Sequence, residues 1–346
     1  MKLPGWWPRR STERTLNLAL QGGGAHGAFT WGVLEALARE PGLVFEGVSG
    51  SSAGAINAVL LADGWMKGGR EGACRALDGF WTAIGAQLPS AAVTSGDPDT
   101  LRLSMSAQWF ADWAGHFSPA QFNPLALNPL RDLLADTVDF KGLQRHSPFK
   151  LFIGTTRAHT AQLRVFRENE LTLDVLLASA CLPRLHHAVE IDGEPYWDGG
   201  YSANPAVFPL FYDCTSADVL LVLLAPLASP GALDSVEAIE ARIGEVAFTA
   251  AFMREMRMFV RAAEFGRPAW TRLGALERRL ANMRFHMIDS GDVAILRRPE
   301  TRVLAHTPLL ARLREQGVER GAAWLAAHLP AVGRHGTLDL AAQFSG

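Results

Sequence analysis

The sequence predicts a three-layer α/β/α domain with a largely parallel central sheet. Short apolar segments at residues 16–20, 44–48 and 150–155 have the length and composition of buried strands. Each of the first two is followed by a glycine-containing turn and then by a helical pattern. Strands that alternate with helices form parallel sheets covered by helices on both faces. A further strand is expected at 219–225, and the chain is strongly helical from about residue 231 onward.

A serine occupies the second of these strand-to-helix turns. Gly50, Ser52 and Gly54 fit the pattern G-x-S-x-G, in which the serine lies on a sharp turn between a strand and a helix. A side chain at either glycine would collide with the tight crossing. An alanine-rich helix is expected over 53–62, ending before Gly64. The serine oxygen would be exposed above the positive end of the helix dipole, so Ser52 is the predicted nucleophile.

The first strand leads into a glycine-rich turn. Gly22, Gly23 and Gly24 follow the alternating strand pattern at 16–20 and precede a helical pattern over about 28–40. Consecutive glycines allow the backbone to point several N–H groups at one place, next to the N-terminus of a helix. Such a turn can hold an anion, either a phosphate or a carbonyl oxygen that becomes negative during a reaction.

The same turn has an alternative interpretation as a nucleotide site. Gly22, Gly24 and Gly27 match the dinucleotide pattern G-x-G-x-x-G. That pattern predicts an acidic residue at the end of the next strand, about 20 residues later, to bind a ribose. Glu46 has a compatible spacing, but the strand that contains it continues into the serine turn, which a nucleotide site leaves unexplained.

An aspartate follows a predicted hairpin far downstream. Residues 188–197 are typical of two short strands joined by an Asp-Gly turn at 192–193. The hairpin leads directly to Asp198, Gly199 and Gly200. An aspartate held between an apolar strand and two glycines is well placed to direct a carboxylate into a cleft, although an isolated Asp-Gly-Gly is more often a simple turn.

In this order and spacing, the three motifs resemble the patatin-like phospholipase family. The small-residue segment 178–183 (Ala-Ser-Ala-Cys-Leu-Pro) is similar to the one that precedes the family's hairpin. The resemblance covers roughly residues 16–225 and implies a patatin-like fold. It also implies an enzyme that hydrolyses acyl esters of lipids, as phospholipases A, lysophospholipases and lipid esterases do.

The resemblance further implies a role for each motif. Ser52 would attack the ester, Asp198 would accept its proton, and the N–H groups of Gly22, Gly23 and Gly24 would form the oxyanion hole. The remaining motif glycines would support the turns that hold these groups, and they are Gly27, Gly50, Gly54, Gly199 and Gly200.

One residue departs from the family pattern. His26 occupies the position where the family usually carries arginine or lysine, as in G-G-G-x-[RK]-G. A histidine there would weaken a positive charge near the hole or make that charge depend on pH. It is also the one residue that favours a second hypothesis, a catalytically silent member of the fold that binds lipid or a protein partner.

A histidine-containing triad is the nearest chemical alternative to a serine–aspartate dyad. Serine needs a group that accepts its proton, and a carboxylate does this only when burial raises its pKa from about 3.9. Ser52, Asp198 and His286 would satisfy the chain order Ser–Asp–His, but His286 lies inside an expected late strand. His186 and His187 begin the hairpin and are candidates for the cleft wall. The motifs do not distinguish hydrolysis from acyl transfer.

Composition sets outer limits on function. The chain has 346 residues, 48% of them hydrophobic, and a formal net charge of −2, which gives no general attraction to nucleic acid. Cys74, Cys181 and Cys214 have neither C-x-x-C nor zinc-like spacing, so a reducing cytoplasm is expected and no metal or cofactor is implied. The first ten residues lack the apolar stretch of a secretory signal. The apolar run at 219–225 is too short to span a bilayer.

The predicted organisation is a tail at 1–14, a catalytic core at 15–230 and a mostly helical region at 231–346, packed on the core. The core contains a helical insertion at about 64–148 that is rich in aromatic residues, interrupted by Pro119, Pro124 and Pro129. These aromatics would either form a lid or acyl channel or pack in the core, and they are Trp81, Trp109, Phe110, Trp113, Phe117 and Phe122.

Two segments suggest contact with a lipid surface. A helix expected from Asp234 to about Phe265 interleaves methionine and phenylalanine with arginine, which suits an anionic membrane but is more typical of a half-buried helix. Trp6-Trp7 and Arg9-Arg10 raise the same idea in the tail, where a flexible end is the simpler interpretation. A lipid ester is thus the expected partner, with peripheral membrane contact as a further expectation.

Overall fold

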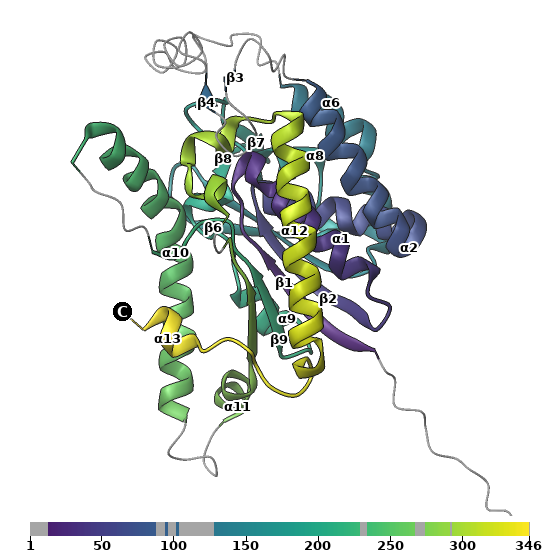
Figure 1. The fold of residues 1–346 in the computed structure, drawn as a ribbon, viewed down its shortest axis with the longest axis vertical. Coiled ribbons are helices and arrows are strands. Elements are labelled where there is room, and N and C mark those ends of the chain that lie inside the picture. Colours follow the sequence, from purple (N-terminus) through teal and green to yellow (C-terminus); the bar gives the residue numbers. More distant parts are fainter. Residues whose placement is uncertain are drawn as a thin grey trace, which may run out of the picture.

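The computed structural model describes residues 13–87, 94–95, 102–103, 128–228, 234–266, 274–290 and 293–345 (Figure 1). The tail residues Trp6, Trp7, Arg9 and Arg10 lie outside the described residues. Most of the aromatic insertion does so as well, namely Trp109, Phe110, Trp113, Phe117 and Phe122 together with Pro119 and Pro124. The lid or channel role of this insertion therefore stays a prediction.

The central sheet is largely parallel, as the sequence predicts. Its parallel strands, in spatial order, are β10 (Arg284–Ile288), β9 (Asp218–Val222), β1 (Arg14–Leu20), β2 (Leu43–Ser51) and β5 (Lys150–Arg157). Two strands pair antiparallel with β5, namely β6 (Leu163–Arg167) and β8 (Glu194–Asp198), and β7 (Val189–Ile191) pairs antiparallel with β8. A separate pair consists of β3 (Thr94–Ser95) and β4 (Arg102–Leu103).

Helices flank the sheet. The α-helices are α1 (Gly27–Arg39), α2 (Ala53–Ala86), α6 (Pro129–Thr137), α7 (Phe140–His146), α8 (Leu173–Ser179), α9 (Phe208–Asp213), α10 (Val236–Gly266), α11 (Ala275–Asn282), α12 (Thr307–His328) and α13 (Leu340–Phe344). The 3-10 helices are η1 (Gly24–His26), η2 (Glu168–Glu170), η3 (Gly199–Tyr201), η5 (Ala294–Arg297), η6 (Pro299–Val303) and η7 (Leu329–Ala331). No described helix is both long and apolar enough to cross a bilayer.

The two faces of the sheet belong to two hydrophobic clusters, which gives the three predicted layers. Successive side chains of a strand point to opposite faces. Along β1, Leu18 and Leu20 pack with α1, α2 and α12 on one face. Ala19 between them packs with α9, α10 and α13 on the other face. Figure 1 shows α10 and α13 on one flank of the molecule and α1 and α2 on the opposite flank.

The serine helix is longer than predicted. The expectation that it ends before Gly64 is wrong, because α2 runs to Ala86 with a break in helical geometry at Gly68 and Gly69. Gly69 has φ +59°, a conformation that glycine adopts without strain. Past this break the helix packs back on itself, since a Cβ on Gly64 would lie 2.4 Å from the carbonyl oxygen of Gly72. Gly64 therefore serves a close contact and does not end the helix.

Candidate active site

Ser52 lies on a strained turn between β2 and α2. Its backbone has φ 55° and ψ −129°, in the left-handed region that a non-glycine residue adopts only at a cost. A Cβ on Gly50 would lie 2.5 Å from the carbonyl of Gly54. A Cβ on Gly54 would lie 2.2 Å from the carbonyl oxygen of Leu20. Both glycines are therefore required by close backbone approaches, and the turn presents the serine above the start of α2.

The end of α8 fixes the backbone of this turn. The N–H of Ser52 donates to both the carbonyl oxygen and the hydroxyl of Ser179, each at 3.0 Å. The Ser179 hydroxyl in turn donates to the carbonyl of Gly154 in β5, at 2.7 Å. The Ser52 N–H is thus engaged within the protein. Sequence reasoning did not select Ser179, although it lies in the small-residue segment already singled out.

The two neighbouring serines have structural hydrogen bonds. Ser49 Oγ donates to the carbonyl of Ala206 at 2.5 Å, and Ser51 Oγ donates to the carbonyl of Ala203 at 2.6 Å. Both bonds attach β2 to the loop that follows the Asp-Gly-Gly motif. Of the three serines, Ser52 is the one whose hydroxyl faces the carboxylate of Asp198, and its residue is 8% exposed.

The pairing of β5 explains why Asp198 lies beside the serine turn. One edge of β5 is occupied by β6 over residues 152–156. The other edge pairs first with β2, up to the contact of Ser51 with Gly154, and then with β8, beginning at Thr155 and Asp198. The ends of β2 and β8 therefore meet on one edge of one strand. The hairpin that carries Asp198 turns at Asp192 and Gly193, as predicted, with both residues at positive φ.

The Asp198 carboxyl group is fully buried. Its Oδ1 accepts the N–H of Gly200 at 2.7 Å, whereas Oδ2 has no partner at hydrogen-bonding distance among the described residues. Burial raises the pKa of Asp198 from 3.8 to about 7, against the lowering effects of the Gly200 N–H and the Ser52 side chain. The hydroxyl and carboxylate face each other without a short bond, as catalytic pairs often do before substrate binds.

The glycine-rich turn supplies fewer free donors than expected. The N–H of Gly22 donates to Asn204 Oδ1 at 2.7 Å, so it is not available to a substrate oxygen. The N–H groups of Gly23 and Gly24 have no acceptor among the described residues. Gly22 is still needed for space, because a Cβ there would lie 2.6 Å from Ser52 Cβ. Gly23 and Gly24 are therefore the expected donors whose N–H groups stay available, and their role in an oxyanion hole stays a prediction.

A C-terminal segment completes this turn. Gly24 has φ +58°, and a Cβ on it would lie 2.3 Å from the carbonyl oxygen of Arg302 in η6. Arg302 also lines the pocket in front of Ser52, and its positive charge lowers the pKa of His26. No sequence motif pointed to this arginine, because 278 positions separate it from Gly24 and only the fold brings them together.

His26 is neutral and buried. Desolvation and the charge of Arg302 lower its pKa to about 3. Of the two expectations for His26, a weaker positive charge therefore fits, and a charge that depends on pH does not. Its Nε2 lies 2.6 Å from the hydroxyl of Thr301, which itself donates to the carbonyl of Arg298 at 2.8 Å. Because the Thr301 hydroxyl hydrogen is donated to Arg298, the Thr301 oxygen is the acceptor in the bond to His26, and the Nε2–H of His26 is the donor. His26 thus joins η1 to η6, and Arg302 is the cation beside the glycine turn.

A pocket of about 510 Å³ opens in front of Ser52. It is bounded on one side by Gly22, Gly23 and Gly24 and on another by α10, whose Phe248 contributes to the wall. The rest of the wall is largely apolar and includes Ile56, Phe80, Trp81, Ile84, Leu130 and Leu182. Such a volume suits a small ligand or one lipid chain. Trp81, one of the insertion aromatics, is therefore part of this wall.

The histidine of the predicted alternative, His286, does not form a triad with Asp198. His286 lies in β10, where Nε2 is 3.2 Å from Asp218 Oδ1 and Nδ1 is 2.9 Å from the Thr337 hydroxyl. Both ring nitrogens of His286 therefore have partners other than Asp198. His186 does line the pocket, as predicted, and burial lowers its pKa.

The nucleotide interpretation does not fit the structure. Glu46 would have to reach the glycine turn at the C-terminal end of β1. Instead its carboxylate accepts the N–H groups of Thr215 and Ser216, at 2.6 and 2.7 Å, and it also pairs with Lys150. β2 continues for five residues beyond Glu46, to Ser51. The serine turn, and not an acidic residue, therefore ends the strand beside the glycines.

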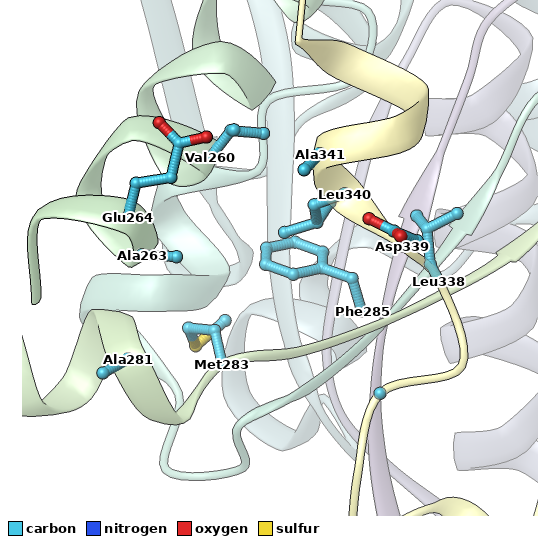
Figure 2. A pocket seen from close by; sticks show the side chains of 11 residues that line it. Val260, Ala263, Glu264, Ala281, Met283, Phe285, Leu338, Asp339, Leu340 and Ala341 are labelled. Carbon is cyan, nitrogen blue, oxygen red and sulfur yellow. The ribbon is translucent and has the colours of Figure 1, made fainter. Parts of the chain in front are cut away.

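A second cavity, of about 470 Å³, lies between α10, α11, β10 and α13 (Figure 2). Figure 2 shows the apolar side chains of Val260, Phe285 and Leu340 around it. Its two carboxylates are engaged, because Glu264 pairs with Arg261 at 2.9 Å and Asp339 accepts the N–H of Ala342 at 3.0 Å. It holds no serine, cysteine or histidine among its described lining residues and does not resemble a reaction site.

The fold and site define an α/β protein in which a serine on a strand-to-helix turn faces a buried aspartate. The chain belongs to the patatin-like phospholipase family, whose profile matches residues 18–211. At the level of the family, this makes it a lipid acyl hydrolase. A search of curated proteins gave no match. Among solved structures, VipD from Legionella pneumophila is similar over 92% of this chain and 67% of its own, with 15% identity and a TM-score of 0.46.

Proposed function

We propose that this chain cleaves acyl esters of lipids through an acyl-enzyme on Ser52, with Asp198 as the general base. The observation that carries the proposal is the pairing of Ser52, on its strained turn, with a buried carboxyl group whose pKa is raised to about 7. A base of this pKa is about half deprotonated at neutral pH and largely deprotonated above it, and it is still basic enough to accept a proton as the hydroxyl attacks.

In the first half of the reaction, Ser52 Oγ attacks the ester carbonyl while its proton passes to Asp198. The vacant lone pairs of Oδ2 make that oxygen the acceptor. The carbonyl oxygen becomes negative and is stabilised by the N–H groups of Gly23 and Gly24. Loss of one such donor typically costs about 3 kcal/mol of transition-state stabilisation. Collapse of the intermediate expels the alcohol, which takes the proton from Asp198.

In the second half, water attacks the acyl group and Asp198 accepts its proton. The same oxyanion donors act again, and the fatty acid leaves as Ser52 recovers its hydrogen. An alcohol in place of water would give acyl transfer. The acyl chain would lie against the apolar wall that includes Phe80, Trp81 and Ile84, where burial of each methylene contributes about 0.8 kcal/mol.

Arg302 adds a positive charge beside the glycine turn. Its place in the pocket wall, next to Gly24, allows it to favour an oxyanion or an anionic lipid head group. Because His26 is neutral at physiological pH, Arg302 and not His26 would supply the positive charge beside the oxyanion. The chemistry needs only side chains and backbone groups of this chain, and the free thiols Cys74, Cys181 and Cys214 fit a reducing, cytoplasmic location.

A fluorophosphonate probe tests the proposal, with the modified residue located by peptide mass spectrometry. We expect an adduct on Ser52 that disappears in Ser52→Ala and forms much more slowly in Asp198→Asn. Ser51→Ala is the matched control, because it removes a neighbouring hydroxyl that bonds to Ala203. Its Ser52 should still be labelled.

The competing hypothesis is a catalytically silent protein that binds lipid or another protein. A folded chain that shows no adduct and no ester hydrolysis, with or without lipid micelles, would support that hypothesis and reject the proposed chemistry. The unpaired oxygen of Asp198 and the free N–H groups of Gly23 and Gly24 favour the active enzyme.

A further inference from the structure

The first half of α10 exposes an apolar stripe to solvent. Val236, Ile239, Ile243 and Val246 have exposed fractions of 67%, 44%, 64% and 46%. Their spacing of three or four residues places them on one side of the helix. A surface helix of a globular protein normally turns such a stripe toward the core. Here the apolar side faces outward, so it is suited to contact with something outside the chain.

The second half of the helix continues this stripe with arginines. Arg254, Arg257 and Arg261 follow Val236, Ile239 and Ile243, respectively, by 18 positions each. Eighteen residues are five full turns, so each arginine lies in line with one apolar residue, about 27 Å further along the helix. All three arginines are exposed, and Arg261 also pairs with Glu264 at 2.9 Å. The outer face of α10, defined by these seven residues, is therefore apolar at one end and basic at the other.

The opposite side of the same helix forms a wall of the Ser52 pocket. Glu240 and Glu245 line the pocket, so these two carboxylates lie on the inner side of the helix. Phe248 packs on η3, directly after Asp198, since a Cβ on Gly200 would lie 2.4 Å from the Phe248 ring. Its ring centroid is 4.6 Å from that of Tyr201. A partner bound to the outer face of α10 would thus be separated from the pocket by the diameter of one helix.

Apolar residues also surround the pocket on other elements. Leu185 and Val303 line the pocket and are 53% and 55% exposed. They come from the loop after α8 and from η6, so the exposed apolar surface near the pocket is not confined to α10. Figure 1 shows α10 on the outer flank of the molecule, with its first half projecting past the sheet.

We propose that the outer face of α10 docks the protein on an anionic phospholipid surface. The apolar end would enter the boundary between head groups and acyl chains, and Arg254, Arg257 and Arg261 would contact anionic head groups. The choice of a lipid surface rests on the proposed function, because the pocket wall formed by the same helix would receive lipid esters. The three arginines favour this surface over an apolar protein partner.

Binding to vesicles tests the docking surface. Vesicles of ether-linked phosphatidylglycerol contain no acyl ester, so the proposed acyl hydrolase cannot consume them during cosedimentation. We expect the full chain to bind these vesicles more tightly than ether-linked phosphatidylcholine vesicles, and to release them as salt is raised. Ile239→Ser with Ile243→Ser should weaken binding to both by about tenfold or more. Arg254→Gln with Arg257→Gln should weaken binding to phosphatidylglycerol alone, by about thirty-fold.

Matched controls use exposed residues of the same types elsewhere. Leu276→Ser changes an apolar side chain on α11 that is 48% exposed, and Arg75→Gln changes an arginine on α2 whose side chain is 69% exposed. Both controls should bind as the unchanged protein does. The α10 variants should also hydrolyse a short, water-soluble ester at the unchanged rate, since none of these positions lies in the pocket wall.

The outcomes separate docking from catalysis. Failure of the unchanged protein to bind vesicles, or equal binding by the α10 variants, would overturn the docking proposal while soluble-ester hydrolysis could still stand. A dimer that the Ile239 and Ile243 substitutions convert to monomer, without a change in vesicle binding, would assign the stripe to a second copy and also overturn it. Vesicle binding without any ester hydrolysis would instead reject the proposed chemistry and leave docking intact.

Discussion

Asn204 Oδ1 accepts the N–H of Gly22 at 2.7 Å, and this bond joins the glycine-rich turn to the loop that follows Asp198. Its side-chain nitrogen also lies 3.4 Å from the carbonyl oxygen of Gly22. The amide side chain of Asn204 therefore bonds to both backbone polar groups of Gly22, its N–H and its carbonyl oxygen. In our proposal Asn204 sets the position of the oxyanion donors relative to the base, and it also lines the Ser52 pocket.

Asn204→Ala should lower kcat for a soluble ester by roughly a hundredfold, because displaced oxyanion donors lose most of their effect. KM should change much less. Asn128→Ala is the matched control, since Asn128 caps α6 through the N–H of Leu130 and lies outside the pocket wall. A full rate in Asn204→Ala would show that the donors do not depend on this bond.

The pH dependence of hydrolysis should follow Asp198. Burial raises its pKa to about 7, so the carboxyl group is protonated below this pH and cannot accept a proton. The rate should therefore rise about tenfold per pH unit up to about pH 7 and then level off. Burial lowers the pKa of His186 from 6.5, so a histidine base would place the rise at a lower pH. Retention of the rise near pH 7 in His186→Gln would support Asp198 as its source.

Asp198→Asn should stabilise the fold above neutral pH while it abolishes catalysis. The folded-state pKa of Asp198 is raised from 3.8 to about 7, so ionisation costs the folded state more than the unfolded state. Stability from this group is present in full below about pH 3.8 and is lost as pH rises to about 7. Each pKa unit corresponds to about 1.4 kcal/mol. Thermal unfolding should show a higher Tm for the variant at pH 8 and a much smaller difference at pH 4.

Arg302 offers a test of charge near the oxyanion. Arg302→Gln should reduce kcat for lipid esters by about tenfold, whereas Arg302→Lys should retain most of it, because a cation remains. The comparison separates charge from packing, since both variants keep the backbone carbonyl that contacts Gly24. Equal losses in the two variants would assign Arg302 a packing role.

Two glycines of α2 should respond in opposite ways to alanine. In Gly54→Ala the new Cβ would lie 2.2 Å from the Leu20 carbonyl oxygen, so the serine turn must shift and both stability and labelling of Ser52 should fall. In Gly79→Ala the new Cβ meets nothing within 4 Å. That change should stabilise the helix by up to about 1 kcal/mol. Chemical denaturation of the two variants checks the contrast.

Local patterns predicted the elements that carry the site. The strand before Gly22, the turn at Ser52 and the hairpin before Asp198 each have a short-range signature, either alternation or a fixed glycine spacing. The late strand containing His286 and the long helix after Asp234 were also predictable, because apolar periodicity extends over each. The break in α2 was not, since a glycine in a helix can mark an end, a kink or a close contact, and Gly64 is the last of these.

The rest of the site depends on contacts between distant segments. Asn204 and Arg302 lie outside the motifs, and Ser179 lies in the small-residue segment without a role that the sequence could assign. Each of the three contacts a backbone group that lies far away in the sequence. The pKa of His26 was likewise not predictable, because it depends on complete burial beside Arg302. The apolar stripe of α10 could be found by helical spacing, but its outward direction required the packing of Phe248 against Gly200.

The shared edge of β5 has a consequence for when the proposed site can form during folding. The β2 end, which carries the serine, and the β8 end, which carries the aspartate, meet only after β5 has paired with both. The glycine turn in addition rests on η6, near the C-terminal end of the chain. A nascent or unfolding chain therefore holds all its reactive groups but no assembled site. Under the proposed mechanism, ester cleavage would therefore begin only after the chain has folded through η6.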